Sequence, residues 1–145
     1  MEASQTVLHA LVIDDQPISR RVLELMLEKL GYTVRLCESG RQGVEAVRHG
    51  QFAVIFIDVN MPGTNGFATT RMIREIQSNT MRSTIVLTSA EYVNVDQDRS
   101  ISAGADSFME KPVQLDSLRS LVNTFQCQTK RPRKPTSRTP AVPAD

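Results

Sequence analysis

The chain has 145 residues, of which 40% are hydrophobic, enough for one domain of ordinary size but not for two well-buried cores. Its 17 Lys and Arg nearly balance its 16 Asp and Glu, so the overall charge favours neither a nucleic-acid binder nor an acidic solubiliser. Cys37 and Cys127 form no CxxC or Cys/His cluster, which argues against a disulfide framework and a zinc site. No apolar run approaches the roughly 18 residues that span a bilayer, so we expect a cytoplasmic protein with no membrane insertion.

The first predicted strand is the apolar run Val7–Ile13, which ends at the acidic pair Asp14 and Asp15. Only His9 interrupts this run, and such a nearly continuous apolar run is typical of a strand that helices cover on both faces. Pro17 suits the first turn of a helix, and Gly31 suits its end. Between them, apolar residues recur at helical spacing: Ile18, Val22, Leu25, Met26 and Leu30.

The same alternation of strand and helix continues along the chain. The most hydrophobic run is 52–57, which predicts the central strand, and Asp58 follows it. Short β-branched runs that alternate with helical patterns are typical of repeated βαβ units. We therefore expect an α/β fold, a flavodoxin-like (βα)5 domain with a five-stranded parallel sheet in the order 2-1-3-4-5. The remaining expected elements are strands at 33–37, 83–88 and 107–110 and helices at 39–49, 67–76, 91–103 and 113–125.

The end of the chain has a different composition. From residue 126 it is rich in Lys, Arg, Pro, Thr and Ser and has almost no large apolar residue, so it cannot bury enough surface to offset the entropy of ordering. We predict one domain over 1–126 and a basic, disordered tail over 127–145. Because no aromatic residues are interleaved with the charges, a solvated linker is favoured over a nucleic-acid contact.

Acidic and other polar residues follow four of the five predicted strands. Asp14 and Asp15 follow the first strand, Asp58 the third, Thr88 ends the fourth, and Lys111 follows the fifth. The carboxyl ends of parallel strands share one edge of the sheet, so these side chains should meet there. Three neighbouring carboxylates repel one another unless a cation neutralises them, and a magnesium ion prefers such oxygen ligands.

This set of groups suits phosphoryl transfer. A carboxylate such as Asp58 is already an adequate nucleophile and needs no adjacent general base. Lys111 and the hydroxyl of Thr88 could stabilise the charged oxygens of a phosphoryl group. Each residue alone has an ordinary explanation, as a solvated turn, a strand end or a surface lysine. Their joint position at the strand ends favours the functional interpretation.

Four motifs together resemble the response-regulator receiver domain, of the single-domain chemotaxis-regulator-like type, over roughly residues 7–126. Each contains a strand end with the polar residues that follow it. They are Val12-Ile13-Asp14-Asp15, then Ile57-Asp58-Val59-Asn60-Met61-Pro62-Gly63 with Gly66, then Leu87-Thr88-Ser89-Ala90, and Gly104-Ala105-Asp106-Ser107-Phe108-Met109-Glu110-Lys111-Pro112.

The resemblance implies a role for each site residue. Asp58 would be the phosphoacceptor, with Lys111 and Thr88 as its catalytic partners. Asp15 and Asp58 would bind Mg²⁺ or Mn²⁺ directly, Asp14 mainly through water, and the backbone carbonyl of Asn60 would complete the protein ligands. Thr88 and Phe108 would form a switch pair, although Phe108 also suits a plain core position. The family further implies a cis peptide before Pro112.

The implied function is that of a phosphoprotein in a two-component regulatory system. A histidine kinase or histidine phosphotransfer protein would donate the phosphoryl group, and the receiver would catalyse its own phosphorylation and slow dephosphorylation. A downstream protein would read the change, or a phosphorelay would pass the group on. An aspartate-dependent phosphohydrolase is disfavoured because its nucleophile follows the first strand in a DxD pattern. A receiver-like interaction module without phosphorylation usually lacks an acid, the Thr or the Lys, and none is missing here.

Overall fold

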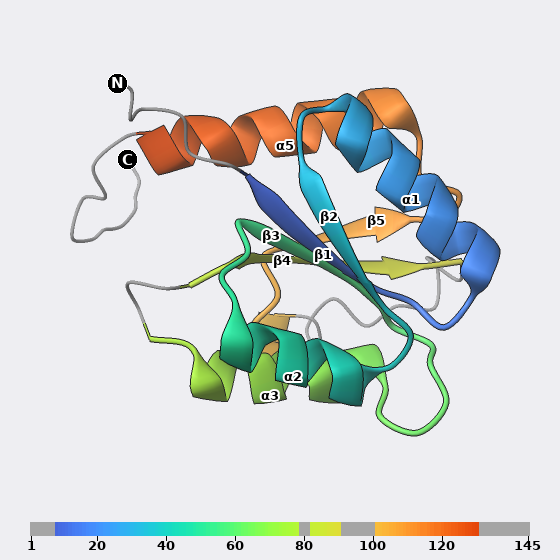
Figure 1. The fold of residues 1–145 in the computed structure, drawn as a ribbon, viewed down its shortest axis with the longest axis vertical. Helices are drawn as coiled ribbons and strands as arrows, with labels where there is room; N and C mark the ends of the chain where they lie inside the picture. Colours follow the sequence, from blue (N-terminus) through green and yellow to red (C-terminus); the bar gives the residue numbers. More distant parts are fainter. Residues whose placement is uncertain (1–7, 79–81, 91–100, 131–145) are drawn as a thin grey trace. The chain divides into compact units, whose positions relative to one another are not determined.

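The computed structural model describes residues 8–78, 82–90 and 101–130, and its centre is a five-stranded parallel sheet (Figure 1). The strand order is β2-β1-β3-β4-β5, with each neighbouring pair parallel. The predicted fold class and strand order are thus confirmed. The strands are β1 (His9–Ile13), β2 (Thr33–Cys37), β3 (Val54–Asp58), β4 (Thr84–Ser89) and β5 (Ser107–Glu110).

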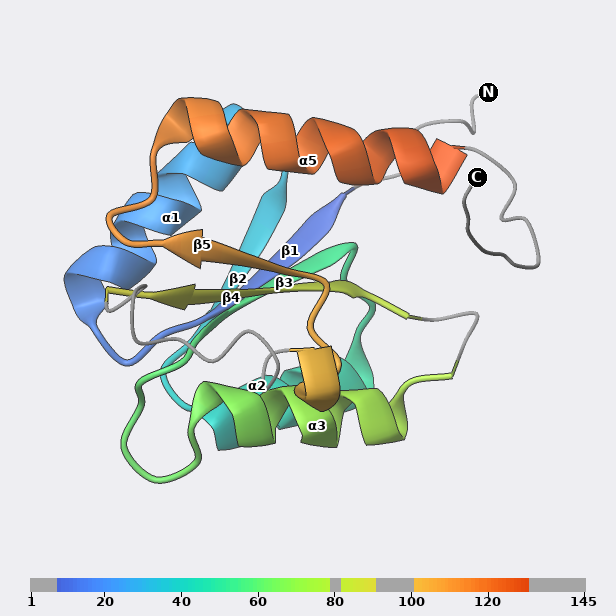
Figure 2. The same ribbon diagram turned by 180° about the vertical axis from the view of Figure 1, so that it is seen from behind.

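Helices cover both faces of this sheet. Within the compact unit that ends at residue 114, α1 (Pro17–Lys29) lies on one face, and α2 (Gly40–His49) and α3 (Gly66–Ile76) lie together on the other (Figures 1 and 2). A second unit begins with α5 (Leu115–Lys130). None of the helices in the described segments is long and apolar enough to cross a membrane.

Local sequence explains where these elements begin and end. All five residues of β3 are buried, and the four before Asp58 are apolar, as predicted for a central strand. Pro17 occupies the first turn of α1, and Gly31 adopts a φ of 99° just after it, a conformation that glycine tolerates best. The side chains of Ser39 and Asn65 accept backbone N–H groups at the starts of α2 and α3.

The structure refines the predictions for three of the helices. α5 extends to Lys130, past the predicted domain end at 126, so the first residues assigned to the tail are helical. In α1 the buried residues are Leu23 and Leu27, which lie outside the apolar series with helical spacing noted in the sequence. Of the predicted helix at 91–103, residues 101–103 are helical and the others lie outside the described residues.

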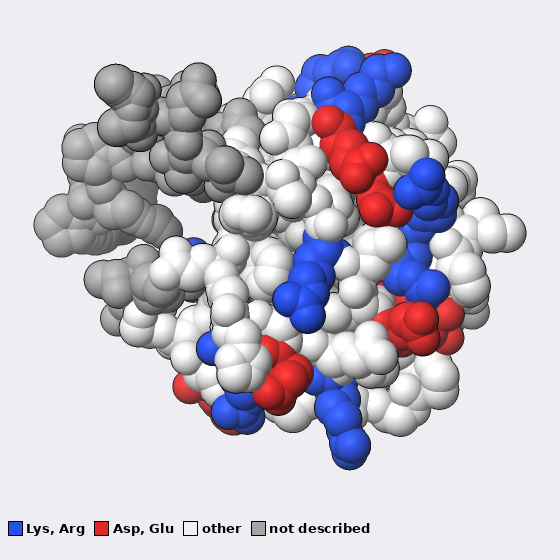
Figure 3. Space-filling model, viewed as in Figure 1, with Lys and Arg blue, Asp and Glu red and all other residues white. Residues whose placement is uncertain are grey.

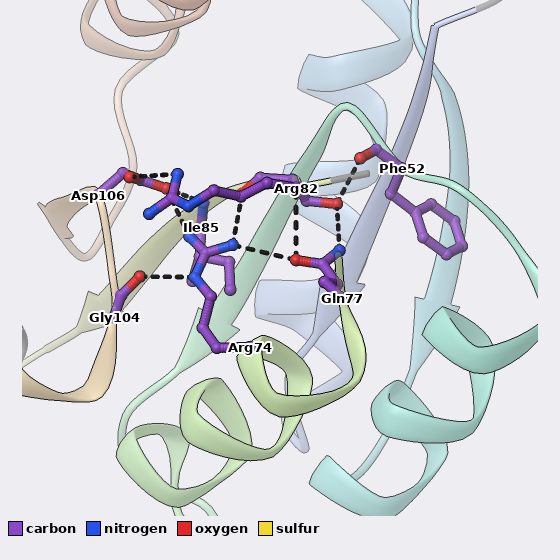
Figure 4. A network of polar contacts seen from close by, with 8 residues as sticks. Phe52, Arg74, Gln77, Arg82, Ile85, Gly104 and Asp106 are labelled. Atoms are coloured by element: carbon purple, nitrogen blue, oxygen red, sulfur yellow. Dashed lines mark hydrogen bonds and ion pairs between the residues drawn. The ribbon is translucent and has the colours of Figure 1, made fainter. Parts of the chain in front are cut away.

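A polar network ties α3 to the amino-terminal edge of the sheet (Figure 4). Arg74 donates through Nε to the carbonyl of Gly104 and through Nη1 to the carbonyl of Ser83, both at 2.8 Å. Its Nη2 lies 2.7 Å from Asp106 Oδ2, and Arg82 Nη1 lies 3.0 Å from the other oxygen of Asp106. The network therefore positions the segments just before β4 and β5.

Candidate phosphoryl-acceptor site

Three carboxylates meet at the carboxyl-terminal edge of the sheet. β1 and β3 are adjacent, with Ile13 opposite Ile57, so the residues that follow Ile13 lie beside Asp58. Asp14, Asp15 and Asp58 each place one carboxylate oxygen so that all three oxygens lie within 4.8 Å of one another. The predicted convergence of these side chains is therefore observed.

Asp14 is held by contacts to its backbone and its side chain. Its N–H donates to the carbonyl of Cys37 at 3.1 Å, and its own carbonyl accepts from Arg20 Nη1 at 2.8 Å. Its Oδ1 accepts the N–H of Gln16 at 2.9 Å, and its Oδ2 lies 2.9 Å from Lys111 Nζ. The β1–α1 loop that carries the acidic pair is consequently fixed on several sides.

Lys111 reaches two of the carboxylates from the end of β5. Its Nζ lies 2.9 Å from Asp14 Oδ2 and 3.3 Å from Asp58 Oδ2, with only 14% of the lysine side chain exposed. Its backbone N–H donates to the carbonyl of Ser89 at 2.9 Å, and the peptide that joins it to Pro112 is cis, as expected. A largely buried ammonium between two carboxylates offsets part of their mutual repulsion.

Burial changes the acidity of Asp58. Removal from water raises the pKa of its carboxyl, the nearby Lys111 lowers it, and the charge of Asp14 raises it again, for a pKa of about 6. The N–H of Asn60, which donates to Asp58 Oδ1 at 3.3 Å, also favours the ionised form. Before any cation binds, Asp58 is therefore a crowded carboxylate whose charge is only partly compensated.

Thr88 and Phe108 differ in their relation to this cluster. Thr88 is buried and lies opposite Asp58 in the β3–β4 register, where its carbonyl accepts the N–H of Val59 at 2.8 Å. Phe108 lies opposite Leu87 on β5 and packs, partly buried, against the hydrophobic core. The structure thus places Thr88 beside Asp58 and gives Phe108 the core position that the sequence also allowed.

The residues present fit a divalent cation. Asp15 Oδ1 is buried and has no hydrogen-bond partner in the described part of the chain, which costs free energy unless a ligand satisfies it. It belongs to the three-carboxylate group, and carboxylate oxygens are the ligands that Mg²⁺ prefers.

Two contacts in the site were not expected from the sequence. The guanidinium of Arg20 and the N–H of Gln16 both bind Asp14. The only sequence signal for Arg20 is its place in the first turns of the helix that follows the acidic pair, where a long side chain can reach back over the loop.

Comparison with known proteins agrees with this geometry. The model of the response regulator receiver domain family matches residues 10–123. The chain belongs to this family. Among curated proteins, this receiver is 35% identical over 118 residues to hybrid signal transduction histidine kinase F of Dictyostelium discoideum, a match that covers 79% of the receiver chain and 11% of the kinase. The receiver chain thus spans only a small part of that relative.

Solved receiver structures are also similar. One is the receiver domain of the sensor histidine kinase PA1611 of Pseudomonas aeruginosa, with a magnesium ion coordinated in its active-site cleft; it is 28% identical with a TM-score of 0.74, over 83% of this chain and 98% of that one. Another is the receiver domain of the histidine kinase CKI1 of Arabidopsis thaliana, complexed with Mg²⁺ and BeF₃⁻. It is 28% identical with a TM-score of 0.72, over 82% of this chain and 89% of that one.

Proposed function

We propose that this receiver accepts a phosphoryl group on Asp58 from the phosphohistidine of a kinase or phosphotransfer protein, and that the added charge changes its binding to a partner. The observation that carries the proposal is the meeting of three carboxylate oxygens within 4.8 Å beside the largely buried ammonium of Lys111. No simpler structural role requires this concentration of charge, because burying like charges together is unfavourable unless a ligand compensates them.

The chemistry assigns a task to each side chain. A carboxylate oxygen of Asp58 attacks the phosphorus and forms an acyl phosphate, while the P–N bond of the phosphohistidine breaks and the imidazole leaves with the bonding electrons. Lys111, 3.3 Å from Asp58, is close enough to contact the oxygens of the transferred group. Thr88, opposite Asp58 on β4, can offer its hydroxyl to the same group. Hydrolysis of the acyl phosphate would return the receiver to its starting state.

Asp14, Asp15, Asp58 and the backbone carbonyl of Asn60 would hold the cation, Mg²⁺ or Mn²⁺, with Asp14 acting mainly through water. When bound, the cation supplies positive charge to the phosphoryl oxygens during transfer. The magnesium ion of the Pseudomonas relative supports this assignment. Asp15 Oδ1 is the buried oxygen whose hydrogen-bonding need the cation would meet.

The switch would begin at Thr88. Negative charge added at Asp58 would draw the Thr88 hydroxyl inward, and Phe108 on the adjacent strand would repack against the core. The predicted rearrangement covers residues 91–108, of which 91–100 lie outside the described residues.

The expected partners are proteins, and the cytoplasm is the expected location. Basic and acidic side chains are interspersed among the described residues of the face shown in Figure 3, without a patch of one sign. Nucleic-acid binding depends on clustered Lys and Arg, so this face gives it no support. An effector role and a relay role both agree with these features.

Phosphate incorporation tests the proposal directly. Wild-type protein incubated with Mg²⁺ and acetyl phosphate should gain one phosphoryl group by intact-mass spectrometry, and Asp58→Asn should gain none. Asp116→Asn, which changes an exposed carboxylate on α5, should be labelled like the wild type. An unlabelled wild type would favour the alternative of an interaction module that works without phosphorylation. Labelling of Asp58→Asn would show that another residue is the acceptor.

A further inference from the structure

The peptide that joins Asp14 to Asp15 is held by Arg20. The guanidinium Nη1 donates to the Asp14 carbonyl at 2.8 Å, and only 14% of the arginine side chain is exposed. Nη2 lies 3.8 Å from Glu38 Oε2, but the Glu38 side chain is 68% exposed, so solvent screens that ion pair. The main contact of Arg20 is therefore with the backbone of the acidic pair.

This contact bears on Asp15 more than on Asp14. Asp14 has three further anchors, its N–H to Cys37, its Oδ1 to Gln16 and its Oδ2 to Lys111. Asp15 Oδ1 has no hydrogen-bond partner within the described segments, so its direction depends on the backbone that carries it. The orientation of the Asp14–Asp15 peptide sets the direction in which the Asp15 side chain leaves the chain. Arg20, bound to the carbonyl of that peptide, fixes this orientation.

We infer that Arg20 is a positioning residue that holds Asp15 in the direction required for cation binding, an inference that rests on the proposed function. It acts on the cation through the backbone of its ligands. Partners that orient metal ligands from outside typically change metal affinity by about 10–100-fold when removed.

A purely electrostatic role for Arg20 predicts the opposite change in Mg²⁺ affinity, so the direction of that change tests the inference. If Arg20 acted only as a nearby positive charge, its removal would strengthen the binding of a divalent cation. If it acts by positioning, its removal weakens binding in spite of the lost repulsion. Arg20→Lys separates the two further, because lysine keeps the charge but lacks the planar guanidinium that reaches the carbonyl.

Arg21 provides a matched control on the same helix. It is the next residue, carries the same charge, and pairs with Glu24 at 2.7 Å on the surface, with 63% of its side chain exposed. Arg21→Gln therefore removes one positive charge beside Arg20 without touching the acidic pair. A change common to Arg20→Gln and Arg21→Gln reports the loss of positive charge from this helix, whereas a change that Arg20→Lys also shows reports position, because lysine keeps the charge.

The experiment is a titration of the full chain with Mg²⁺ by calorimetry, together with urea unfolding in the absence of metal. We expect the Mg²⁺ dissociation constant to rise about tenfold in Arg20→Gln and several-fold in Arg20→Lys, and to change less than about twofold in Arg21→Gln. Labelling by acetyl phosphate should need correspondingly more Mg²⁺ in Arg20→Gln but approach the wild-type rate once Mg²⁺ is saturating.

Other results would overturn the inference. Tighter Mg²⁺ binding in Arg20→Gln would assign the residue a purely electrostatic effect. An unchanged dissociation constant with a lower unfolding midpoint would assign it a purely structural one. A wild-type chain that binds no Mg²⁺ would instead count against the proposed function itself, which keeps the two failures distinct.

Discussion

At the scale of single residues, Asp58 meets two opposing requirements. A nucleophilic carboxylate must be ionised, but burial and the neighbouring Asp14 favour its neutral form and raise its pKa to about 6. At neutral pH the Asp58 carboxyl is ionised. Its buried negative charge destabilises the folded protein until a cation binds. The arrangement that would place a reactive carboxylate at Asp58 therefore lowers stability in the metal-free state.

The sign of this effect gives a prediction. Because the folded pKa of Asp58 lies above the ordinary value of 3.8, the native state holds this proton more tightly, so its ionisation destabilises the fold as pH rises from about 4 to 6 and remains unfavourable above that range. Metal-free Asp58→Asn should therefore be more stable than the wild type at pH 7.5, by about 1–3 kcal/mol. The gain should shrink as pH is lowered towards 4, as measured by urea unfolding over a pH series.

Asp116→Asn is the control, because the Asp116 side chain is 96% exposed. The stability of this variant should equal that of the wild type at each pH. Magnesium should stabilise the wild type more than Asp58→Asn and so reduce the difference between them, because the variant lacks one of the proposed carboxylate ligands. If the free energy of unfolding depended on pH in the same way in the wild type and in Asp58→Asn, ionisation of the Asp58 carboxyl would not destabilise the fold.

At the scale of elements, the Arg74 network holds α3 to the segments that lead into β4 and β5 (Figure 4). Asp106 Oδ2 also accepts the N–H of Ile85 at 2.9 Å, so one carboxylate joins the guanidinium to the strand backbone. Burial and the charge of Arg82 lower the pKa of Arg74, while Asp106 opposes them. A charge-assisted network of this kind is costly to break, because each partner left behind loses its compensation.

Arg74→Met should accordingly lower the free energy of unfolding by about 2–4 kcal/mol, since it leaves two carbonyls and part of a carboxylate unsatisfied. Arg71→Met, at an exposed position of the same helix, should change it by less than about 0.5 kcal/mol. Urea unfolding measures both. The Mg²⁺ affinity should be unchanged in both variants, because the network lies at the opposite edge of the sheet from the carboxylates; a loss of affinity in Arg74→Met would contradict this separation.

The elements also show what could be predicted from the sequence. The central strand was predictable because every residue before Asp58 in it is apolar, and the acidic cluster because parallel strands bring their carboxyl ends to one edge. The buried face of α1 was not. Leu23 and Leu27 are four residues apart, as are Ile18 and Val22, and only the packing of the helix decides which pair is covered.

Polar contacts were less predictable than strands. Arg74 and Asp106 are separated by 32 residues in the sequence. No local sequence pattern predicts an ion pair between residues so far apart along the chain. Arg20 binds a backbone carbonyl, which every residue possesses, so no partner residue marks the contact in the sequence. Lys111 was predictable only because it follows a strand whose end lies at the site.

At the scale of the whole molecule, the question is where the functional receiver ends. The sequence predicts a boundary at 126, and α5 continues to Lys130. Beyond this helix the chain holds the basic residues Arg131, Arg133, Lys134 and Arg138, with almost no apolar surface to bury. We therefore propose that residues 131–145 are dispensable for both folding and phosphoryl acceptance.

Truncation after Lys130 tests this boundary. We expect the chain 1–130 to melt within about 1 °C of the full chain, to bind Mg²⁺ with the same affinity and to be labelled at the same rate, because a segment of this composition has little apolar surface to contribute to stability. The chain 1–126 is the informative comparison, since it removes helical residues from α5 and should melt at a lower temperature. If 1–130 melted several degrees below the full chain, the last fifteen residues would make stabilising contacts that their composition does not predict, and the receiver would extend beyond its last described helix.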